Sequence, residues 1–274
     1  LVVLSACHIA APPVPDHFKA DSVALAKAEE LRDSLETVVN GGGNLGRFSA
    51  LNSQADKLGL GPHVRTEGID WFSLQRNVVI DLPGLSSETI YLVAHYDKTD
   101  ANPLVFLSLL LNGVLDPLVS TTFLSDGAID NASGVSVVLQ LASDLQNKQH
   151  HYSYRILFPG AEESGLRGTR AHIARLTPEE IMRIKYVINV DSVGVLGAGN
   201  CVTRGVSDPQ LSYLAKTVAH KAGIPLGEDK ISTSAVSDYL PFMETNFYAD
   251  VSYGIKFNYI GGLLPQRSWF TNPV

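Results

Sequence analysis

Cysteine is nearly absent from this chain, since Cys7 and Cys201 are the only two in 274 residues. Two cysteines cannot form a disulfide framework, which excludes a small scaffold held together by disulfides. Basic charge is also scarce, because 21 Lys and Arg stand against 28 Asp and Glu, for a net charge of −7. Without a basic stripe to neutralise phosphates, a nucleic acid is not expected as a partner. The 45% of hydrophobic residues fits a globular enzyme rather than a disordered chain.

An apolar segment at residues 103–119 (PLVFLSLLLNGVLDPLV) is too short and too interrupted to cross a bilayer. Its polar interruptions include Asn112 and Asp116, and Pro117 follows. We expect either a hydrophobic lid or pocket wall beside His95, or a surface loop that packs on the core.

The first residues resemble a bacterial lipobox. Leu4-Ser5-Ala6-Cys7 follows an apolar start, and residues 10–15 (AAPPVP) would form an extended tether. We therefore expect residues 1–20 to be a lipoprotein signal remnant and tether. The protein would lie in the bacterial cell envelope, with a lipid anchor on Cys7 as its only membrane contact and Cys201 as a buried thiol. The alternative is a short apolar segment with a chance cysteine.

Strands and helices are expected to alternate along the rest of the chain. Apolar periodicity, helix caps and Gly or Pro breaks mark these elements. The expected strands are 77–82, 89–94, 154–158 and 186–190, and the expected helices are 21–39, 48–58, 134–145, 165–175, 208–222 and one that starts at Thr177. This alternation predicts an α/β fold with a mostly parallel sheet, whose ligands bind beyond the carboxyl ends of the strands.

Ionisable residues stand directly after three of these strands and before one helix. They are His95 and Asp97, Glu162 and Glu163, and Asp191 after the strands, and Asp130 before the helix at 134–145. Taken singly, His95 could be a core histidine, Asp130 a helix cap and the two glutamates a solvated pair. Together they would meet at one edge of the sheet, where burying them is costly without a cation. His, Asp and Glu are side chains that zinc accepts, so the pattern predicts a metal site.

The order AHYD, GAIDNASGV, PGAEESGLRGTR and NVDSVG resembles the zinc exopeptidases typified by secreted bacterial double-zinc aminopeptidases. Glutamate carboxypeptidase-like enzymes and glutaminyl cyclases belong to the same superfamily. The resemblance covers residues 77–242. It implies a mixed, mainly parallel eight-stranded sheet flanked by helices, within a single zinc peptidase domain at residues 21–274. It also implies two zinc ions and a peptide substrate.

The resemblance assigns metal ligands, which are His95, Asp130, Glu163 and Asp191. His95 and Asp191 would hold one zinc and Glu163 the other, with Asp130 bridging both. The peptide between Asp130 and Asn131 is expected to be cis.

Two further residues would serve catalysis rather than bind metal. Glu162 matches the general base, which must lie beside the metals without binding them so that it can take a proton from water. Asp97 matches a carboxylate that hydrogen-bonds and orients His95.

The family's fifth ligand, a histidine near the C-terminus, has no counterpart in this sequence. No histidine follows His220, which we interpret as a surface residue of a helix. We expect the chain to be truncated at both ends, with the missing ligand beyond Val274 and the second zinc bound weakly. The alternative is a gene product with one damaged zinc site.

One other segment, Ser237-Asp238 to Phe242, resembles the family's SD-x-x-x-F sequence near the substrate entrance. Asp238 is either a residue on the substrate side of the site or a helix N-cap.

The sequence thus favours a metallo-aminopeptidase that hydrolyses N-terminal residues from peptides, with a zinc-activated water and a glutamate base. A glutaminyl-cyclase-like acyl transferase, which uses a single zinc, is the first alternative. A non-catalytic ectodomain of the same fold is the second.

Overall fold

A computed structural model describes residues 22–71, 73–98, 126–194, 200–204, 206–230, 236–248 and 256–262. The lipobox and tether that we expect at residues 1–20, the apolar segment at 103–119 and residues 263–274 lie outside these ranges. Within them, no helix is both long enough and apolar enough to cross a membrane.

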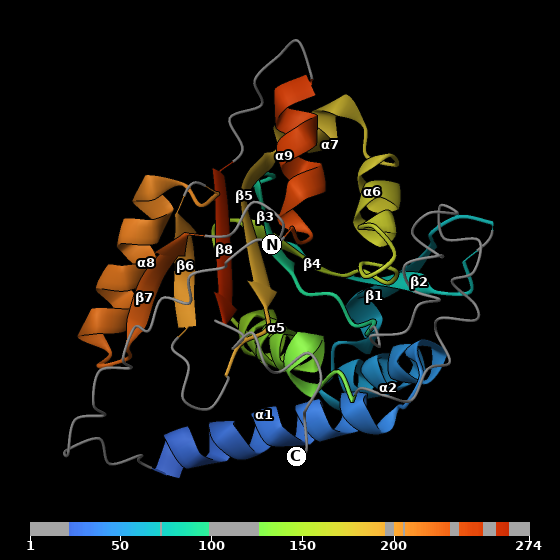
Figure 1. Ribbon diagram of the computed structural model, residues 1–274, viewed down its shortest axis with the longest axis horizontal. Coiled ribbons are helices and arrows are strands. Elements are labelled where there is room, and N and C mark those ends of the chain that lie inside the picture. The colour runs from blue at the N-terminus through green and yellow to red at the C-terminus, as the bar shows by residue number, and fades with distance from the viewer. Residues whose placement is uncertain are drawn as a thin grey trace, which may run out of the picture.

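The strands form one mixed sheet in the order β1-β2-β4-β3-β5-β8-β6-β7 (Figure 1). Their bounds are β1 Val64–Gly68, β2 Arg76–Leu82, β3 Thr89–Val93, β4 Ser153–Phe158, β5 Ile184–Asp191, β6 Asn200–Arg204, β7 Leu226–Lys230 and β8 Lys256–Gly262. The predicted α/β fold, a mixed sheet flanked by helices, is confirmed.

Parallel pairing is concentrated in the centre of the sheet, where β4, β3, β5 and β8 are parallel neighbours. The pairs β1–β2, β2–β4 and β6–β8 are antiparallel. The expectation of a mainly parallel sheet therefore holds for the centre and for the edge pair β6–β7, which is also parallel, but not for the other pairs on the flanks. Residues 83–88 between β2 and β3 are too few to form the helical crossover that joins two parallel strands. Strand β3 therefore cannot run parallel to β2. Helix α5 (Gly134–Gln146) does provide such a crossover, and β4 is parallel to β3.

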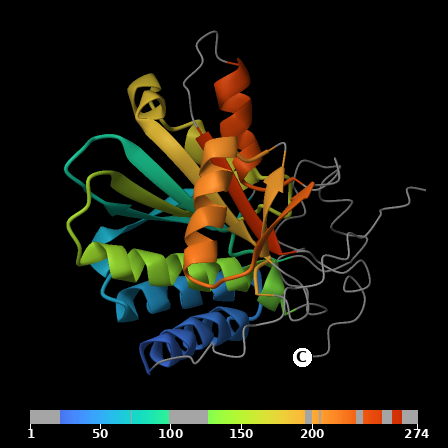
Figure 2. The same ribbon diagram turned by 90° about the vertical axis from the view of Figure 1, so that its left-hand side faces the viewer.

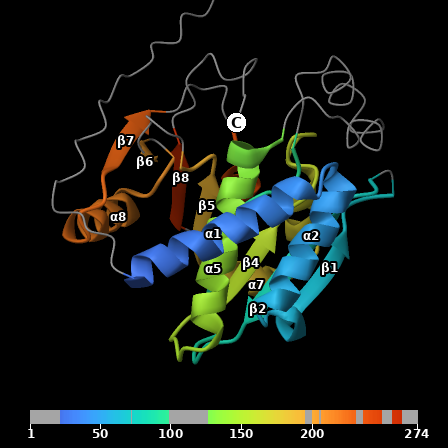
Figure 3. The ribbon, with the colours of Figure 1, turned by 90° about the horizontal axis from the view of Figure 1, so that it is seen from below.

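Two layers of helices cover the sheet (Figures 1 and 2). One layer contains α5 with α1 (Ser22–Asn40) and α2 (Asn44–Lys57), which lie side by side (Figure 3). The opposite layer contains α6 (Arg167–Ile173), α7 (Pro178–Met182) and α9 (Tyr239–Tyr248), and α8 (Pro209–Lys221) covers β6 and β7. A capping box between Thr177 and Glu180 starts α7, as its sequence predicted.

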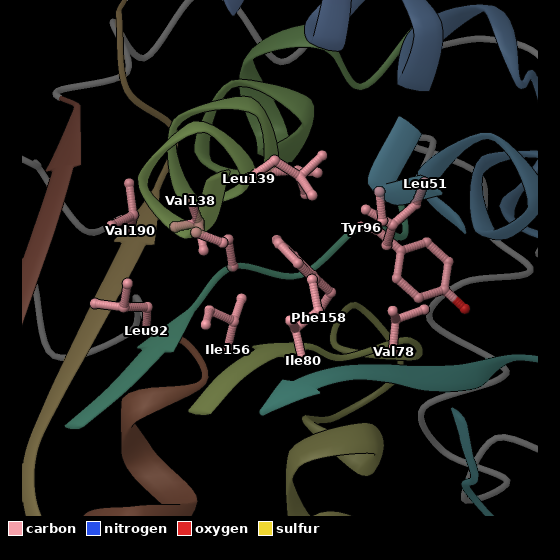
Figure 4. Close-up of a cluster of buried hydrophobic side chains, with 14 of the residues drawn as sticks. Leu51, Val78, Ile80, Leu92, Tyr96, Val138, Leu139, Ile156, Phe158 and Val190 are labelled. Atoms are coloured by element: carbon pink, nitrogen blue, oxygen red, sulfur yellow. The ribbon is translucent and has the colours of Figure 1, made fainter. Parts of the chain in front are cut away.

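The main core lies between α5 and the centre of the sheet (Figure 4). Val138 and Leu139 of α5 are fully buried with Ile80, Ile156 and Phe158 of the strands. Each such side chain contributes roughly 1.5–3 kcal/mol through its burial. A second cluster on the other face buries alternate residues of the same strands. Buried on both faces, the central strands hold their carboxyl ends at fixed positions.

Several short elements were not predicted from the sequence. They are β1, β6, β7, β8 and α9. The strands β1 (VRTEG) and β7 (LGEDK) are polar and stand at the two edges of the sheet, where an apolar pattern is not required. Cys201 on β6 is buried, as expected.

Candidate metal centre

His95 lies just beyond β3 and is almost completely buried. Its Nδ1 atom makes a hydrogen bond of 3.1 Å with the main-chain oxygen of Asp97, which fixes the orientation of the ring. The other ring nitrogen, Nε2, lies 3.1 Å from Asp130 Oδ1 and 3.5 Å from Asp191 Oδ1. One imidazole thus faces two carboxylates that come from different elements.

Asp130 lies in an irregular helical turn, Ala128–Ser133, that leads into α5. The peptide that joins it to Asn131 is cis, which confirms the expectation. The fully buried Asn131 side chain ties this turn to β5, because its Nδ2 donates to Val190 O at 3.0 Å. Its Oδ1 accepts hydrogen bonds from the N–H groups of Gly134 (2.9 Å) and Ser192 (3.1 Å). Asn131 therefore sets the position of Asp130 relative to the end of β5.

Asp191 is the last residue of β5 and has two hydroxyl partners. Ser237 Oγ donates to its Oδ2 at 2.7 Å, and Ser192 Oγ donates to its Oδ1 at 3.1 Å. Burial alone would raise the pKa of Asp191, but the charge of His95 and these hydrogen bonds lower it. Asp191 is therefore held as a carboxylate at the site.

Glu162 and Glu163 occupy the turn between β4 and α6. Ala161 at its start and Leu166 at its end have positive φ angles of 54° and 61°, so the chain reverses sharply here. Glu162 Oε2 lies 4.0 Å from His95 Nε2, and the Glu162 side chain is 10% exposed.

The role expected for the Asp97 carboxylate, to hydrogen-bond and orient His95, stays a prediction. Asp97 Oδ1 lies 3.6 Å from His95 Nδ1, beyond hydrogen-bond distance. The carboxylate instead accepts the main-chain N–H groups of Glu162 at 3.1 Å and Glu163 at 3.2 Å. These two donors of a tight turn need a buried acceptor, and the Asp97 carboxylate supplies it.

The carboxyl groups at this edge of the sheet repel one another. Burial is the largest cause that raises the pKa of Asp130, and neighbouring negative charge is the next. Burial and negative neighbours also raise the pKa values of Glu162 and Glu163 well above their usual range. Among the negative neighbours, Asp191 does most to raise the pKa of Asp130, and Asp130 does most to raise that of Glu163. The Glu162 and Asp191 side chains are only 10% and 11% exposed and that of Asp130 is 40% exposed, and acids crowded together in this way are costly unless a cation neutralises them.

The residues present fit a metal ion. Ligand atoms of His95, Asp130 and Asp191 all lie within 4.8 Å of one another. Asp130 Oδ1 is buried and, within the described part of the chain, accepts no hydrogen bond of normal geometry. A nitrogen and a carboxylate oxygen that face each other in this way are suited to share a cation, and zinc prefers this donor set. The Glu163 carboxylate is not part of this tight group, although its charge is coupled to Asp130.

Asp238 lies directly before α9 and is completely buried. Its Oδ1 accepts a short hydrogen bond from the Thr169 hydroxyl of α6, while Oδ2 has no hydrogen-bond partner among the described residues. Burial raises the pKa of Asp238 to about 7. Through its hydrogen bond with Thr169, Asp238 joins α6 to the start of α9 beside the site. His220, by contrast, is exposed on α8, as interpreted from the sequence.

Sequence reasoning missed two buried polar residues next to this centre, Asn44 and Arg47 of α2. Neither belongs to a recognisable motif. The available signal was an arginine four residues before the core residue Leu51, on the same face of the helix.

The sequence profile described as peptidase family M28 matches residues 77–258. An aminopeptidase of Pseudomonas aeruginosa is 30% identical over 141 residues, which cover 50% of this chain and 25% of that protein. This chain thus spans about a quarter of that relative's length.

Two solved structures share the fold. A leucine aminopeptidase precursor from Bacteroides thetaiotaomicron has a TM-score of 0.66 and 19% identity, with 89% of this chain and 88% of that chain covered. A glutaminyl cyclase from an Acidobacteriales bacterium has a TM-score of 0.65 and 16% identity, with 85% and 78% covered. At these identities, the likeness concerns the fold alone.

Proposed function

Because this chain belongs to peptidase family M28, we propose that it is the catalytic part of a zinc-dependent aminopeptidase that hydrolyses N-terminal residues from peptides. The observation that carries the proposal is the convergence of His95, Asp130 and Asp191 on one point, with Glu162 beside them. Zinc, when bound, supplies a Lewis acid that polarises a carbonyl and lowers the pKa of a water.

We assign His95 and Asp191 to one zinc and Glu163 to a second, with Asp130 between them. The hydrogen bonds from Ser192 and Ser237 orient the Asp191 carboxylate, and the Asp97 main chain orients the His95 ring. Both ligands are thus restrained before a metal arrives, which reduces the entropy lost on binding.

We assign the role of general base to Glu162. Its buried carboxyl has a raised pKa, which favours a group that must accept a proton from water and pass it to the leaving amine. Its main-chain N–H is fixed by Asp97, so the side chain starts from a defined position. Among neighbouring negative charges, that of Asp130 does most to raise the pKa of Glu163, the next residue, and we assign the two neighbours different roles.

The proposal is tested with an aminoacyl-p-nitroanilide and its N-acetylated form as the matched control. The protein is expected to release nitroaniline from the free-amine compound alone, to lose this activity with a chelator and to regain it with zinc. Equal cleavage of the acetylated compound, or full activity in chelator, would contradict the proposal.

A glutaminyl-cyclase-like acyl transferase is the second candidate, favoured by the fold that this chain shares with a glutaminyl cyclase. The two are separated with a peptide that begins with Gln. An aminopeptidase releases free glutamine, whereas a cyclase leaves the peptide intact with a loss of ammonia. A folded protein that binds no zinc and changes neither substrate would support a non-catalytic ectodomain.

We also propose that Cys7 carries a lipid that anchors the protein in the bacterial cell envelope. The Leu4-Ser5-Ala6-Cys7 sequence supports this proposal. Cys7→Ser is expected to move the protein from the membrane fraction to the soluble fraction of the cell. No change in fractionation would contradict the anchor.

A further inference from the structure

Helix α2 presents two buried polar side chains from its first turn. Asn44 is 2% exposed and Arg47 is fully buried, although arginine is seldom found without access to water. Both residues precede residue 77, where the match to the peptidase family begins. Burial of such groups is tolerated only when their hydrogen bonds are satisfied, so their partners indicate what they do.

Arg47 bonds to two separate segments of main chain. Its Nε donates to Tyr96 O at 2.6 Å, Nη1 donates to Asp126 O at 2.9 Å, and Nη2 donates to Gly127 O at 3.1 Å. One planar guanidinium thus joins the segment that follows β3 to the segment that leads into α5.

Asn44 bonds to the segment that follows β3 at Lys98, the residue directly after Asp97. Its Nδ2 donates to Lys98 O at 3.3 Å, and its Oδ1 accepts from Lys98 N at 3.0 Å. Tyr96 and Lys98 flank Asp97, so α2 fixes the main chain on both sides of that residue.

The two segments carry the facing atoms of the metal centre. His95 Nε2 and Asp130 Oδ1 lie 3.1 Å apart. His95 directly precedes Tyr96, and Asp130 stands three positions after Gly127. Gly127 itself has a φ of +57°, and a methyl group there would lie 2.8 Å from Arg47 Nη1. Lys98 Cβ at 2.7 Å and Asp130 O at 3.0 Å approach this point as well, so Arg47 and these two neighbours together leave no room for a side chain here.

Charge gives Arg47 a second effect on the same acids. Burial lowers its pKa to about 10, and the nearby charges of Asp97, Asp130 and Glu163 oppose that change. Arg47 therefore stays protonated at neutral pH and offsets part of their repulsion. The three hydrogen bonds described above all go to main-chain carbonyl oxygens, so these contacts of Arg47 fix the position of the chain.

We propose that Asn44 and Arg47 are positioning residues of the metal centre, which hold the His95–Asp97 segment and the Asp130 turn at the separation that zinc requires. This inference rests on the proposed function only in its choice of zinc as the ion. Lysine keeps the charge of Arg47 but cannot make three hydrogen bonds in the plane of a guanidinium.

The test measures zinc binding to the metal-free protein, by competition with a chelating dye, and the rise in unfolding temperature on zinc addition. Arg47→Lys is expected to weaken zinc binding about ten-fold or more and to reduce that rise. Asn44→Ala, which removes little volume, is expected to show the same change to a smaller extent. The matched controls are Arg32→Lys on the exposed face of α1 and Asn52→Ala, which changes a half-buried asparagine of α2 itself.

A purely structural role gives a different result. Arg47→Lys would then lower the unfolding temperatures of the metal-free and zinc-loaded protein equally, with unchanged zinc affinity, and that outcome overturns the inference. If Arg47→Lys does not fold, Asn44→Ala decides by the same comparison. Because the readout is zinc binding, a protein that binds zinc but cleaves no aminoacyl anilide refutes the proposed function and leaves this test intact.

Discussion

The Asp97 carboxylate accepts a hydrogen bond of 3.1 Å from the main-chain N–H of Glu162, which stands 65 residues later in the chain. A second hydrogen bond, from Glu163 N, reaches the other oxygen at 3.2 Å. One buried side chain next to His95 therefore also fixes the turn that carries the proposed general base. A substitution of Asp97 should therefore affect both His95 and the turn that carries Glu162.

Asp97→Asn is expected to lower kcat about ten-fold or more with little change in KM. The amide retains one acceptor oxygen, so one of the two N–H groups of the turn loses its buried partner, which costs about 1–3 kcal/mol. Steady-state kinetics on an aminoacyl anilide measure the effect. Asp208→Asn is the control. The Asp208 side chain caps the start of α8, and an asparagine caps a helix equally well. Equal kinetics for both variants would contradict the role of Asp97.

Glu162→Gln and Glu163→Gln are expected to differ although the residues are adjacent. The first removes the base and should lower kcat by about 100-fold or more, with zinc content unchanged. The second removes a ligand and should lower the zinc content, with partial recovery of activity in excess zinc. Metal analysis together with kinetics separates the two. Loss of zinc in Glu162→Gln would contradict the assignment.

Asn131→Ala is expected to destabilise the protein by about 2–4 kcal/mol, because three buried main-chain groups lose a partner. Urea denaturation of the metal-free protein measures the change. The matched control is Asn52→Ala, where one hydrogen bond to Phe48 O is lost at a half-buried position. We expect that control to cost less than about 1 kcal/mol. Equal costs would show that Asn131 does not tie the turn to β5.

Glu67 on β1 should make stability depend on acid pH. Burial alone would raise its pKa, but the hydrogen bond and charge of His172, with those of Arg65, lower the pKa to about 2 from an ordinary 4.5. The stabilisation is present above the unfolded value and is lost as pH falls from about 4.5 toward 2. The stability difference between the wild type and Glu67→Gln should therefore narrow over this range, as followed by denaturation at each pH.

Glu88→Gln is the control for that experiment. Glu88 pairs with Lys185 at a partly exposed position, where an ion pair contributes little to stability. A difference between the wild type and Glu67→Gln that stays constant from pH 5 to pH 2 would contradict the role of Glu67.

Much of the centre was predictable from the sequence because its residues stand at the ends of strongly apolar strands. The strands before His95 and Asp191 are buried on both faces, and such strands direct their carboxyl ends to one edge. The flanks were less predictable, since the edge strands β1 and β7 carry polar side chains and owe their pairing to neighbours. The hydrogen bonds from the Glu162 turn to the Asp97 carboxylate were not predicted, because that turn is remote in the chain.

The sequence by itself determined the α/β class, the central strands and the acids and imidazole that follow them, because apolar periodicity and strand order are local properties. Tertiary structure alone decided that Asp97 binds the turn of Glu162, that Asn131 holds Asp130 to β5 and that α2 places Asn44 and Arg47 behind the centre. These contacts join residues that stand 49 to 80 positions apart in the chain. No local pattern encodes such pairs, because each depends on how buried donors and acceptors are satisfied once the whole chain has packed.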